Sequence, residues 1–259
     1  MSVQDVSPVL ITRDAAATIE RTLRHLEEFP EVVVYDNGSA DRTLELCQRF
    51  RNVRVVQGPF MGFGPTKNHA AGLARTDWVL SLDADECPSE QLLATLRGLP
   101  LTDPTVAYAV ERRNFFMGKE VRRAGWGNNW LVRLFNRRHC RFTDALVHEK
   151  VIVPQTCTVV RLGGPLWHEA VTDLDQFLQK ISRYSELNRR DGGKPRPPAN
   201  ILLRANWSFF KSYVLKLGFL EGWRGVAIAE GDAVGTFYKH MKRYADKAVA
   251  AEPRRPPPE

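Results

Sequence analysis

The sequence has few cysteines, and their spacing does not suit a metal site. Four cysteines occur in 259 residues, and no two of them have the close spacing of a zinc-ligand pair. They are Cys47, Cys87, Cys140 and Cys157. This pattern argues against a disulfide scaffold and a structural zinc site, and it is typical of a protein that works in a reducing compartment.

The sequence also lacks a secretory signal and any long apolar run. Asp5 stands where a signal peptide carries basic residues, and the apolar run 8–11 is too short for its hydrophobic region. No run approaches the roughly 18 apolar residues of a membrane-spanning helix. We therefore expect the protein to remain on the cytoplasmic side of the membrane.

Charge is plentiful but unevenly distributed. The chain is 43% hydrophobic, which is enough for a core, and its net charge is +7. The window Glu111–Arg141 holds nine basic and two acidic residues, so it alone accounts for that net charge. A local positive field attracts nucleic acid, a phosphorylated glycolipid or an anionic membrane surface, although an ordinary solvated face has the same composition.

Strand and helix patterns alternate through the first eighty residues. Strands are predicted at 6–12, 31–35 and 53–57, and helices at 15–28, 41–50 and 66–74. Ser39, in a turn-forming cluster, is expected to cap the second helix. The alternation predicts an α/β fold with a mostly parallel central sheet flanked by helices, an architecture that often binds nucleotides.

A buried strand beginning at Trp78 runs directly into the carboxylates Asp83, Asp85 and Glu86. In open α/β sheets, ligands bind beyond the carboxyl ends of such strands. Alternate residues of an extended chain point the same way, so Asp83 and Asp85 are predicted to face one point, which suits Mg²⁺ or Mn²⁺. The alternative is a solvated acidic turn before the helix that begins near Ser89.

Lys67 lies in the first turn of the helix that follows the glycine-rich loop 58–65. A lysine there opposes the helix dipole, so it indicates an anionic ligand unless it is a plain surface residue. The loop lacks the Gly-Lys-Ser/Thr ending of a phosphate loop and the spacing of a dinucleotide fingerprint, which disfavours ATPases and dehydrogenases.

The pattern changes after residue 100. Strands are predicted at 106–110 and 130–135, with a basic and aromatic segment that includes Trp126 between them. Two His-Glu pairs follow, at 148–149 and 168–169. A lone histidine is usually structural, but two such pairs beyond a predicted metal site make a functional role at least as plausible as a structural one.

The remaining sequence is predicted to be helical. A helix is expected at 172–190, then a proline-rich linker, a helical stripe around Trp207–Leu217, a glycine-punctuated stretch 218–235 and a helix at 236–249. Arg204 and Lys211 flank the aromatic-aliphatic stripe, which suits either a helix lying in a membrane surface or an ordinary packing helix.

Several of these segments together resemble an inverting glycosyltransferase of family 2 with the GT-A fold. The matching motifs are Thr-Arg-Asp at 12–14, Tyr-Asp-Asn-Gly-Ser at 35–39, Lys-Asn at 67–68 and Asp-Ala-Asp-Glu at 83–86. Within that family, segments 113–115, 125–128 and 147–149, and the helix with Lys180 and Tyr184, are similar to bacterial lipopolysaccharide-core glucosyltransferases. The resemblance covers about residues 5 to 245.

The resemblance implies a role for each matched position. Donor binding is expected from Thr12, Asp14, Asp36, Asn37, Lys67, Asp83 and Ala84. A divalent metal, Mg²⁺ or Mn²⁺, is expected on Asp83 and Asp85, with His148 or His168 completing its contacts. Glu149 is the first choice for the base and Asp144 the second. An anionic glycolipid acceptor is expected at Trp126, Arg122 and Arg123. Asp14 and the His-Glu pair depart from the family pattern.

The implied organisation is a GT-A catalytic domain at 1–190, with a donor half at about 5–100 and an acceptor half at about 101–190. A helical extension at 191–249, for which membrane association is one alternative, and a disordered tail at 250–259 would follow. The implied reaction moves glucose from UDP-glucose to an inner-core heptose by metal-assisted single displacement, at the inner face of the bacterial inner membrane and without nucleic acid. The alternatives left open are a polyprenyl-phosphate glycosyltransferase, a metal-dependent nucleotidyltransferase and a basic nucleic-acid-binding module.

Overall fold

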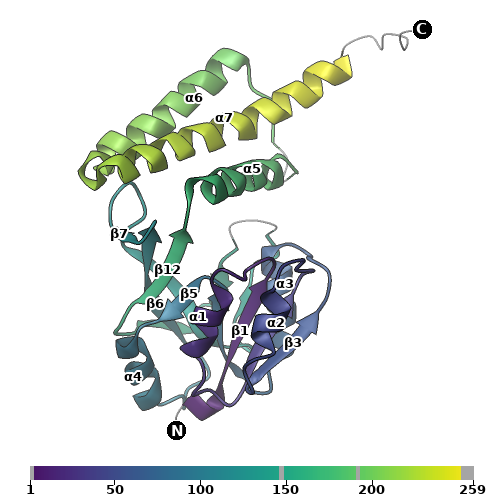
Figure 1. The fold of residues 1–259 in the computed structure, drawn as a ribbon, viewed down its shortest axis with the longest axis vertical. Helices are drawn as coiled ribbons and strands as arrows, with labels where there is room; N and C mark the ends of the chain where they lie inside the picture. The colour runs from purple at the N-terminus through teal and green to yellow at the C-terminus, as the bar shows by residue number, and fades with distance from the viewer. Residues whose placement is uncertain (1–2, 146–148, 191–192, 252–259) are drawn as a thin grey trace. The chain divides into compact units, whose positions relative to one another are not determined.

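The computed structural model describes residues 3–145, 149–190 and 193–251. The chain divides into two compact units (Figure 1). The first unit contains residues 1–120 and 128–170, and the second contains residues 121–127 and 171–259. The helix at 174–190, which the sequence assigned to the catalytic domain, groups with the C-terminal helices in the second compact unit. The extent of the catalytic domain, 1–190, stays a prediction.

The first unit begins with alternating strands and helices. The strands are β1 (Val6–Thr12), β2 (Val32–Asp36), β3 (Val53–Gln57) and β4 (Trp78–Asp83), and they pair in parallel in the order β3-β2-β1-β4. A short 3-10 helix, η1 (Val3–Asp5), precedes them, and the helices between them are α1 (Ile19–Arg24), α2 (Thr43–Cys47) and α3 (Phe63–Gly72).

The rest of the sheet is mainly antiparallel. Its elements are β5 (Glu86–Pro88), α4 (Glu90–Gly98), β6 (Val106–Phe116), β7 (Lys119–Val121), β8 (Asn129–Asn136), β11 (Thr158–Arg161) and β12 (Leu166–Val171), with β9 (Arg141–Phe142) and β10 (Val151–Ile152) forming a separate ribbon. β8 lies antiparallel between β4 and β6. The predicted α/β class is confirmed, and the sheet is mixed, being parallel in its first half.

Continuous apolar runs place β1, β2 and β4 in the centre of the sheet. Nearly every residue of these strands is buried, as expected where helices cover both faces of a parallel sheet. Leu10 and Leu82 pack into one hydrophobic cluster, and Val9 and Val79 pack into another. Because both faces are packed, the polar ends of the strands are left for ligand chemistry.

Ser39 does not cap α2, which differs from the sequence prediction. The residue that precedes this helix is Arg42, and it makes no side-chain cap hydrogen bond. Ser39 instead bonds to Asp36, and its hydroxyl accepts from the backbone N–H of Asp14. The predicted start of α4 is confirmed, because Ser89 Oγ accepts from the backbone N–H of Leu92 at 3.1 Å.

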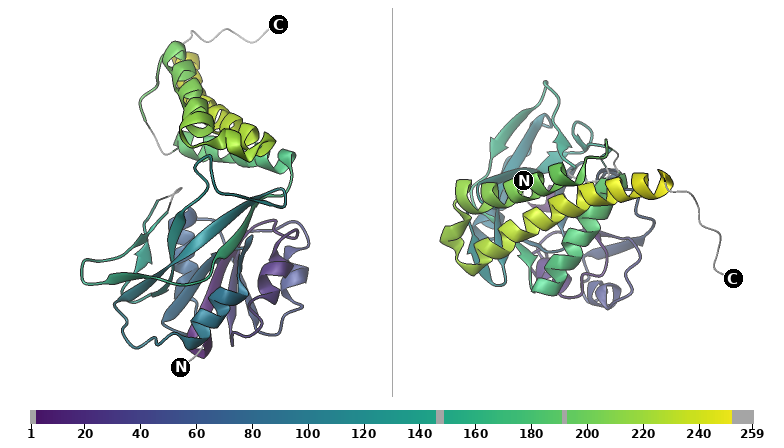
Figure 2. Two further views of the ribbon diagram at one scale, coloured as in Figure 1. Left: turned by 90° about the vertical axis from the view of Figure 1, so that its left-hand side faces the viewer. Right: turned by 90° about the horizontal axis from the view of Figure 1, so that it is seen from above.

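The second unit is helical. It contains α5 (Leu174–Arg190), α6 (Pro198–Phe210), the π-helix η2 (Lys211–Leu215), the 3-10 helix η3 (Gly218–Glu221) and α7 (Trp223–Ala251). Figure 2 shows α6 and α7 running side by side as a hairpin. Within the described ranges, none of the helices has the length and apolar content that crossing a membrane requires.

α7 is one helix across the glycine-punctuated stretch that the sequence analysis separated from it. Two of its glycines are sites of close packing: a Cβ at Gly231 would lie 2.5 Å from the Phe177 ring, and one at Gly225 would lie 1.8 Å from the Gly218 carbonyl oxygen. Neighbouring segments therefore approach the helix where a side chain is missing. This gain in packing offsets the low helix propensity of glycine.

Two glycines of α3 provide a stability test. A Cβ at Gly64 would lie 1.8 Å from the Thr143 carbonyl oxygen, whereas a Cβ at Gly72 would meet nothing within 4 Å. We expect Gly64→Ala to lower the free energy of unfolding by about 1–3 kcal/mol, because a backbone segment must move. Gly72→Ala should raise it by up to about 1 kcal/mol. Urea denaturation measures both, and equal effects would contradict the close approach at Gly64.

Candidate functional site

Polar residues end three neighbouring parallel strands in the first unit. Thr12 pairs in register with Asp36, and Ile11 pairs with Asp83, so the ends of β1, β2 and β4 meet at one edge. The hydroxyl of Thr12 is buried and has no hydrogen-bond partner in the part of the chain that the structure describes. Buried hydroxyls are normally paired, so this one is suited to a ligand at the sheet edge.

The loops after β1 and β2 are joined to each other by hydrogen bonds. Asp36 is fully buried, and its Oδ1 accepts from the backbone N–H groups of Gly38 and Ser39, each at 3.0 Å. Asp14 has a φ of 52°, and its Oδ1 accepts from the backbone N–H of Ala40 at 2.8 Å. Both carboxylates thus shape the edge, and their contact with a donor remains a prediction.

Two other predicted donor-binding residues also contact the chain itself. Asn37 Nδ2 donates to the Gly58 carbonyl oxygen at 3.4 Å. The Ala84 carbonyl oxygen accepts from the Thr22 hydroxyl at 3.0 Å. These bonds hold the loop that follows β3 and the turn that follows β4, so both residues stay predicted donor contacts.

Asp83 is neutralised by side chains from distant segments. Its two carboxylate oxygens lie 2.8 Å from Lys67 Nζ and 3.0 Å from Arg133 Nη2. Glu86, which is fully buried, contacts Arg133 and also lies 3.3 Å from Arg112 Nη1. We call these five residues the charged cluster. Asp83 and Glu86 thus have basic partners within the protein, and metal binding by Asp83 stays a prediction.

The ion pairs of the charged cluster shift the pKa of its members. Burial alone would raise the pKa of Asp83, but the charges of Lys67 and Arg133 outweigh it and hold that pKa well below its usual range. Burial likewise opposes the charged form of Lys67, yet the neighbouring carboxylates, Asp83 foremost, raise its pKa. Both groups stay charged at neutral pH.

Asp85 faces a different partner from Asp83. The extended backbone of β4 ends at Asp83, and residues 84 and 85 form a turn before β5. The alternation that was expected to direct both aspartates to one point therefore does not apply. Strand β12 pairs antiparallel with β5 and sets His168 opposite Glu86. The Nε2 atom of His168 then lies 3.5 Å from the Asp85 carboxylate.

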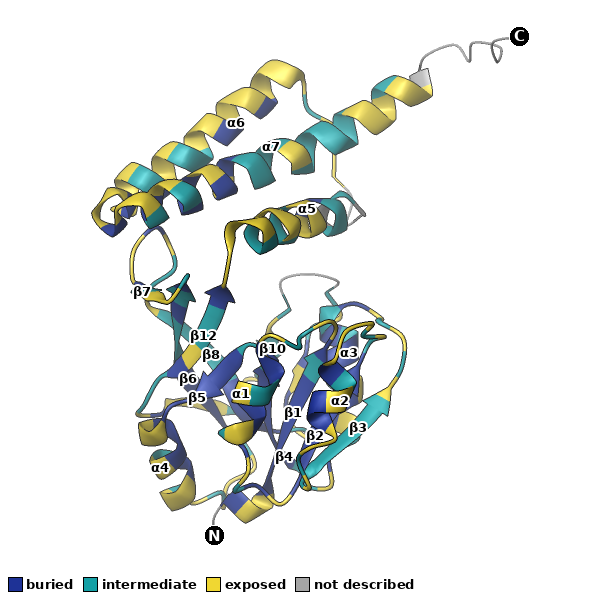
Figure 3. Ribbon diagram, viewed as in Figure 1, coloured by how far each residue is buried: buried dark blue, intermediate teal, exposed yellow. Residues whose placement is uncertain are grey.

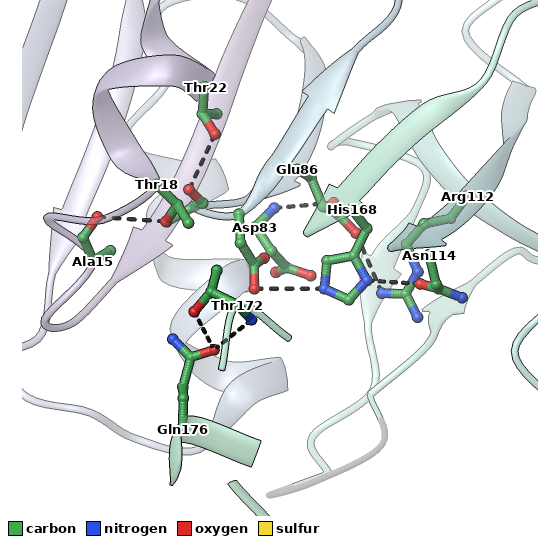
Figure 4. Close-up of polar contacts among 12 residues, drawn as sticks. Ala15, Thr18, Thr22, Asp83, Glu86, Arg112, Asn114, His168, Thr172 and Gln176 are labelled. Carbon is green, nitrogen blue, oxygen red and sulfur yellow. Dashed lines mark hydrogen bonds and ion pairs between the residues drawn. The ribbon is translucent and has the colours of Figure 1, made fainter. Parts of the chain in front are cut away.

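Asn114 orients the His168 ring. The Nδ1 atom of His168 lies 2.7 Å from Asn114 Oδ1, the contact drawn in Figure 4. An amide oxygen only accepts, so Nδ1 carries the hydrogen, and in the neutral ring Nε2 presents a lone pair toward Asp85. Two electron-rich atoms that face each other favour a cation between them. A carboxylate with an imidazole held by an outer hydrogen bond is a donor pair that fits a divalent metal.

The protein supplies few ligands of this kind. Among the described residues, no group of three or more His, Cys, Asp or Glu side chains is arranged to hold a metal ion. Asp85 and His168 could therefore contribute only part of a coordination shell, and oxygen atoms of a ligand or of water would complete it. His148, the other predicted histidine, lies outside the described residues.

The two candidate bases lie in different surroundings. Glu149 Oε1 is 2.7 Å from Lys67 Nζ, and only 16% of its side chain is exposed. Through Lys67 it belongs to the same network as Asp83. Asp144 is 70% exposed and pairs with Arg141 at 3.0 Å. The fold thus brings Glu149, but not Asp144, into contact with another predicted site residue.

The basic window is not one continuous positive surface. At least six of its nine basic residues have carboxylate partners, namely Arg112, Arg113, Arg133, Arg137, Arg138 and Arg141. The predicted acceptor residues Arg122, Arg123 and Trp126 belong to the second unit. There the backbone N–H groups of Arg122 and Arg123 donate to Glu221 at 3.1 Å.

Sequence reasoning missed the roles of Arg133 and Asn114. Arg133 interrupts the apolar strand 130–135, and a charge in the middle of such a strand is a signal of a buried ion pair. Asn114 lies in segment 113–115, which carries part of the family resemblance, but its contact with His168, 54 positions away, had no signal in the sequence. Only strand pairing brings these two side chains together.

The sequence is similar to known glycosyltransferases. The sequence profile described as Glycosyl transferase family 2 matches residues 7–160. The lipopolysaccharide core biosynthesis glycosyltransferase LpsC of Rhizobium meliloti is 27% identical over 96% of this chain and 95% of its own length. An uncharacterized glycosyltransferase of Rickettsia prowazekii is 26% identical over 85% and 80%. The solved structure of Staphylococcus aureus TarS is 15% identical, covering 93% of this chain and 54% of that one, with a TM-score of 0.46.

The charged cluster predicts a pH-dependent loss of stability. Arg133→Met should lower the free energy of unfolding by about 3–5 kcal/mol at pH 7, because buried Glu86 then depends on its 3.3 Å contact with Arg112, and Asp83 depends on Lys67. The depressed pKa of Asp83 stabilises the fold above the unfolded pKa of about 4, and this contribution is lost as pH falls through the folded pKa. The deficit of the variant should therefore shrink below about pH 4.

Arg138→Met is the matched control, because Arg138 forms an exposed pair with Asp77 just beyond the same strand. It should change the free energy of unfolding by no more than about 0.5 kcal/mol. Chemical denaturation at several pH values measures both variants. A deficit for Arg133→Met that stays constant down to pH 2–3, or one no larger than that of Arg138→Met, would contradict the assignment.

Proposed function

Because this chain belongs to glycosyl transferase family 2, we propose that it moves glucose from UDP-glucose onto an inner-core heptose of lipopolysaccharide, with inversion at the anomeric carbon. The chain is a glycosyltransferase. The donor sugar and the acceptor are our proposal, supported by the Rhizobium relative that is named for lipopolysaccharide core biosynthesis and aligns over nearly its whole length.

The observation that carries the proposal is the series of contacts from Asn114 to His168 to Asp85, beside the ends of β1, β2 and β4. Two electron-rich atoms, His168 Nε2 and an Asp85 oxygen, face each other at 3.5 Å. Thr12 offers a buried hydroxyl with no partner among the described residues at the same sheet edge. A nucleoside diphosphate fits both features of this edge. Its base and ribose can form hydrogen bonds with groups such as the Thr12 hydroxyl, and its anionic diphosphate can share a cation with Asp85 and His168.

We assign the metal to Asp85 and His168. A bound Mg²⁺ or Mn²⁺ would offset the negative charge that grows on the leaving diphosphate. Asp83, whose oxygens are held by Lys67 and Arg133, is better suited to the donor ribose than to the metal. Lys67 is 97% buried in this network, so it positions Asp83 and Glu149 instead of reaching freely to phosphate.

We assign the catalytic base to Glu149. In a single displacement the acceptor hydroxyl attacks the anomeric carbon from the face opposite the diphosphate, and a carboxylate accepts its proton late in the reaction. Glu149 is held by Lys67 within the network that contains Asp83, whereas Asp144 is exposed and paired with Arg141. A proton transferred to Glu149 leaves Lys67 paired with Asp83.

The basic window gives little support to the nucleic-acid alternative, since most of its arginines are paired with carboxylates. The two enzymatic alternatives differ in their products. A nucleotidyltransferase would release pyrophosphate, and a polyprenyl-phosphate enzyme would label a lipid phosphate. A glucosyltransferase of the proposed kind releases UDP and labels the heptose acceptor.

The metal assignment is tested with Asp85→Ala. In the wild type, UDP-glucose should raise the melting temperature more with Mn²⁺ than without it, because a ligand that binds the native state stabilises it. Asp85→Ala should abolish this difference and reduce transfer by at least about a hundredfold. Asp77→Ala, which removes a carboxylate before β4, should retain both properties. An unchanged Mn²⁺ effect in Asp85→Ala would refute the assignment.

The base assignment is tested by comparing two amide substitutions. Glu149→Gln should lower the transfer rate by about 10²–10⁴-fold while UDP-glucose binding is retained, because only the proton acceptor is lost. Asp144→Asn should keep most of the activity. Single-turnover transfer and donor titration separate the two effects, and the reverse ranking of the variants would assign the base to Asp144.

A further inference from the structure

Large apolar side chains are exposed at one end of the hairpin in the second unit. Six of them lie where α6 passes through η2 and η3 into α7: Val214, Leu215, Leu217, Phe219, Leu220 and Trp223, which we call the apolar tip. They are between 39% and 57% exposed. Figure 3 shows exposed residues at this end of the hairpin. A group of exposed apolar side chains this dense indicates a binding surface.

The backbone of the apolar tip is held in place from its polar side. The Ser212 hydroxyl donates to the Ala124 carbonyl oxygen at 3.1 Å, and the Ala124 N–H donates to the Lys216 carbonyl oxygen at 2.9 Å. Glu221 is buried, and it accepts from the backbone N–H groups of the loop 121–127. The polar groups of the turn are thus used internally, which leaves the apolar side chains outside.

The backbone conformation of Leu217 is a second feature of the apolar tip that indicates a binding surface. Its φ is 57°, a left-handed conformation that is costly for a leucine and easy for glycine or asparagine. Strained backbone persists where the surrounding structure imposes it, often at binding surfaces. The exposed Leu217 side chain adds nothing to the hydrophobic core, and glycine or asparagine would form this turn at a lower backbone cost.

Positive charge surrounds the apolar tip. The segment 196–226 contains five basic residues and one acidic residue, and the acidic one is the buried Glu221. Lys211 and Lys216 are exposed, as are Arg122 and Arg123 on the loop bonded to Glu221. We call these four residues the basic rim. The Arg224 guanidinium also stacks over the Trp223 ring at 4.5 Å.

An apolar centre with a basic rim matches a surface that is anionic outside and apolar beneath. A lipid bilayer with anionic headgroups has this layering, because leucine and aromatic side chains enter the acyl boundary while lysine and arginine stay at the phosphates. A second copy of this chain would bring a like-charged rim against the basic rim, which is unfavourable.

We propose that the apolar tip and the basic rim form a docking surface for an anionic lipid bilayer. The attachment is peripheral, and it is carried by the hairpin end and the loop 121–127. The inference rests on the proposed function for its biological meaning, since a lipid-anchored acceptor would be met at such a surface. The binding itself depends only on lipid and salt.

Flotation of the full chain with lipid vesicles tests this surface. Vesicles of phosphatidylcholine alone are compared with vesicles containing about one third phosphatidylglycerol, in low and high salt. The wild type should bind the anionic vesicles, and high salt should weaken this binding several-fold. Leu215→Ser with Leu220→Ser should weaken it by at least about tenfold, since two apolar side chains no longer leave water.

The matched control is Leu174→Ser with Leu178→Ser on α5. Leu178 and Leu215 are each 57% exposed, so the two double variants remove similar exposed apolar area from the same unit. The control should bind like the wild type, and thermal melting checks that both variants fold. Equal loss in both variants, or no binding by the wild type, would overturn the proposal.

Two further outcomes are also decisive. If the wild type is a dimer without lipid and the substitutions in the apolar tip make it monomeric, this surface is an interface between copies and the membrane assignment is overturned. Vesicle binding is measured without donor or acceptor, so a failure of the proposed transfer reaction does not alter this result. Asp85→Ala should bind vesicles like the wild type.

Discussion

The site depends on the burial of Asp83 between Lys67 and Arg133. A carboxylate removed from water is costly unless opposite charges and hydrogen bonds replace the solvent. Here one cation comes from α3 and the other from β8, at 2.8 Å and 3.0 Å. The ion pairs therefore tie the parallel and antiparallel halves of the sheet together at the strand ends where the donor is proposed to bind.

The same ion pairs separate the tasks of the two aspartates in the Asp-Ala-Asp motif. Asp83 still belongs to β4, and its oxygens are used by fixed cations. Asp85 lies beyond the end of the strand, in a turn that directs it to His168. If both aspartates had bound the metal, Lys67 and Arg133 would have competed with it. The fold gives one carboxylate an internal partner and leaves the other close to an oriented imidazole.

Positive charge is likewise divided between two uses. Arg112 and Arg133 are turned inward and balance Glu86 and Asp83, so they hold the first unit together. Arg122 and Arg123 lie on a loop that belongs to the second unit and use their backbone N–H groups to bind Glu221. Residues close together in one basic stretch thus have different contacts, because the loop 121–127 belongs to the second unit and its flanking residues belong to the first.

The sequence by itself determined the α/β class, the strands β1 and β3 to the residue, and the location of polar residues at strand ends. These features depend on local periodicity and on apolar runs, which neighbouring residues carry. Only the tertiary structure decided the partners of the carboxylates, the continuity of α7 and the exposure of the apolar tip. Lys67, Arg133 and His168 are distant from Asp83 and Asp85 in the sequence, and their distances are set by the packing of α3 and by the pairing of strands. Gly231 and Gly225 of α7 are recognised as packing positions only from the close approach of Phe177 and Gly218 in the folded structure.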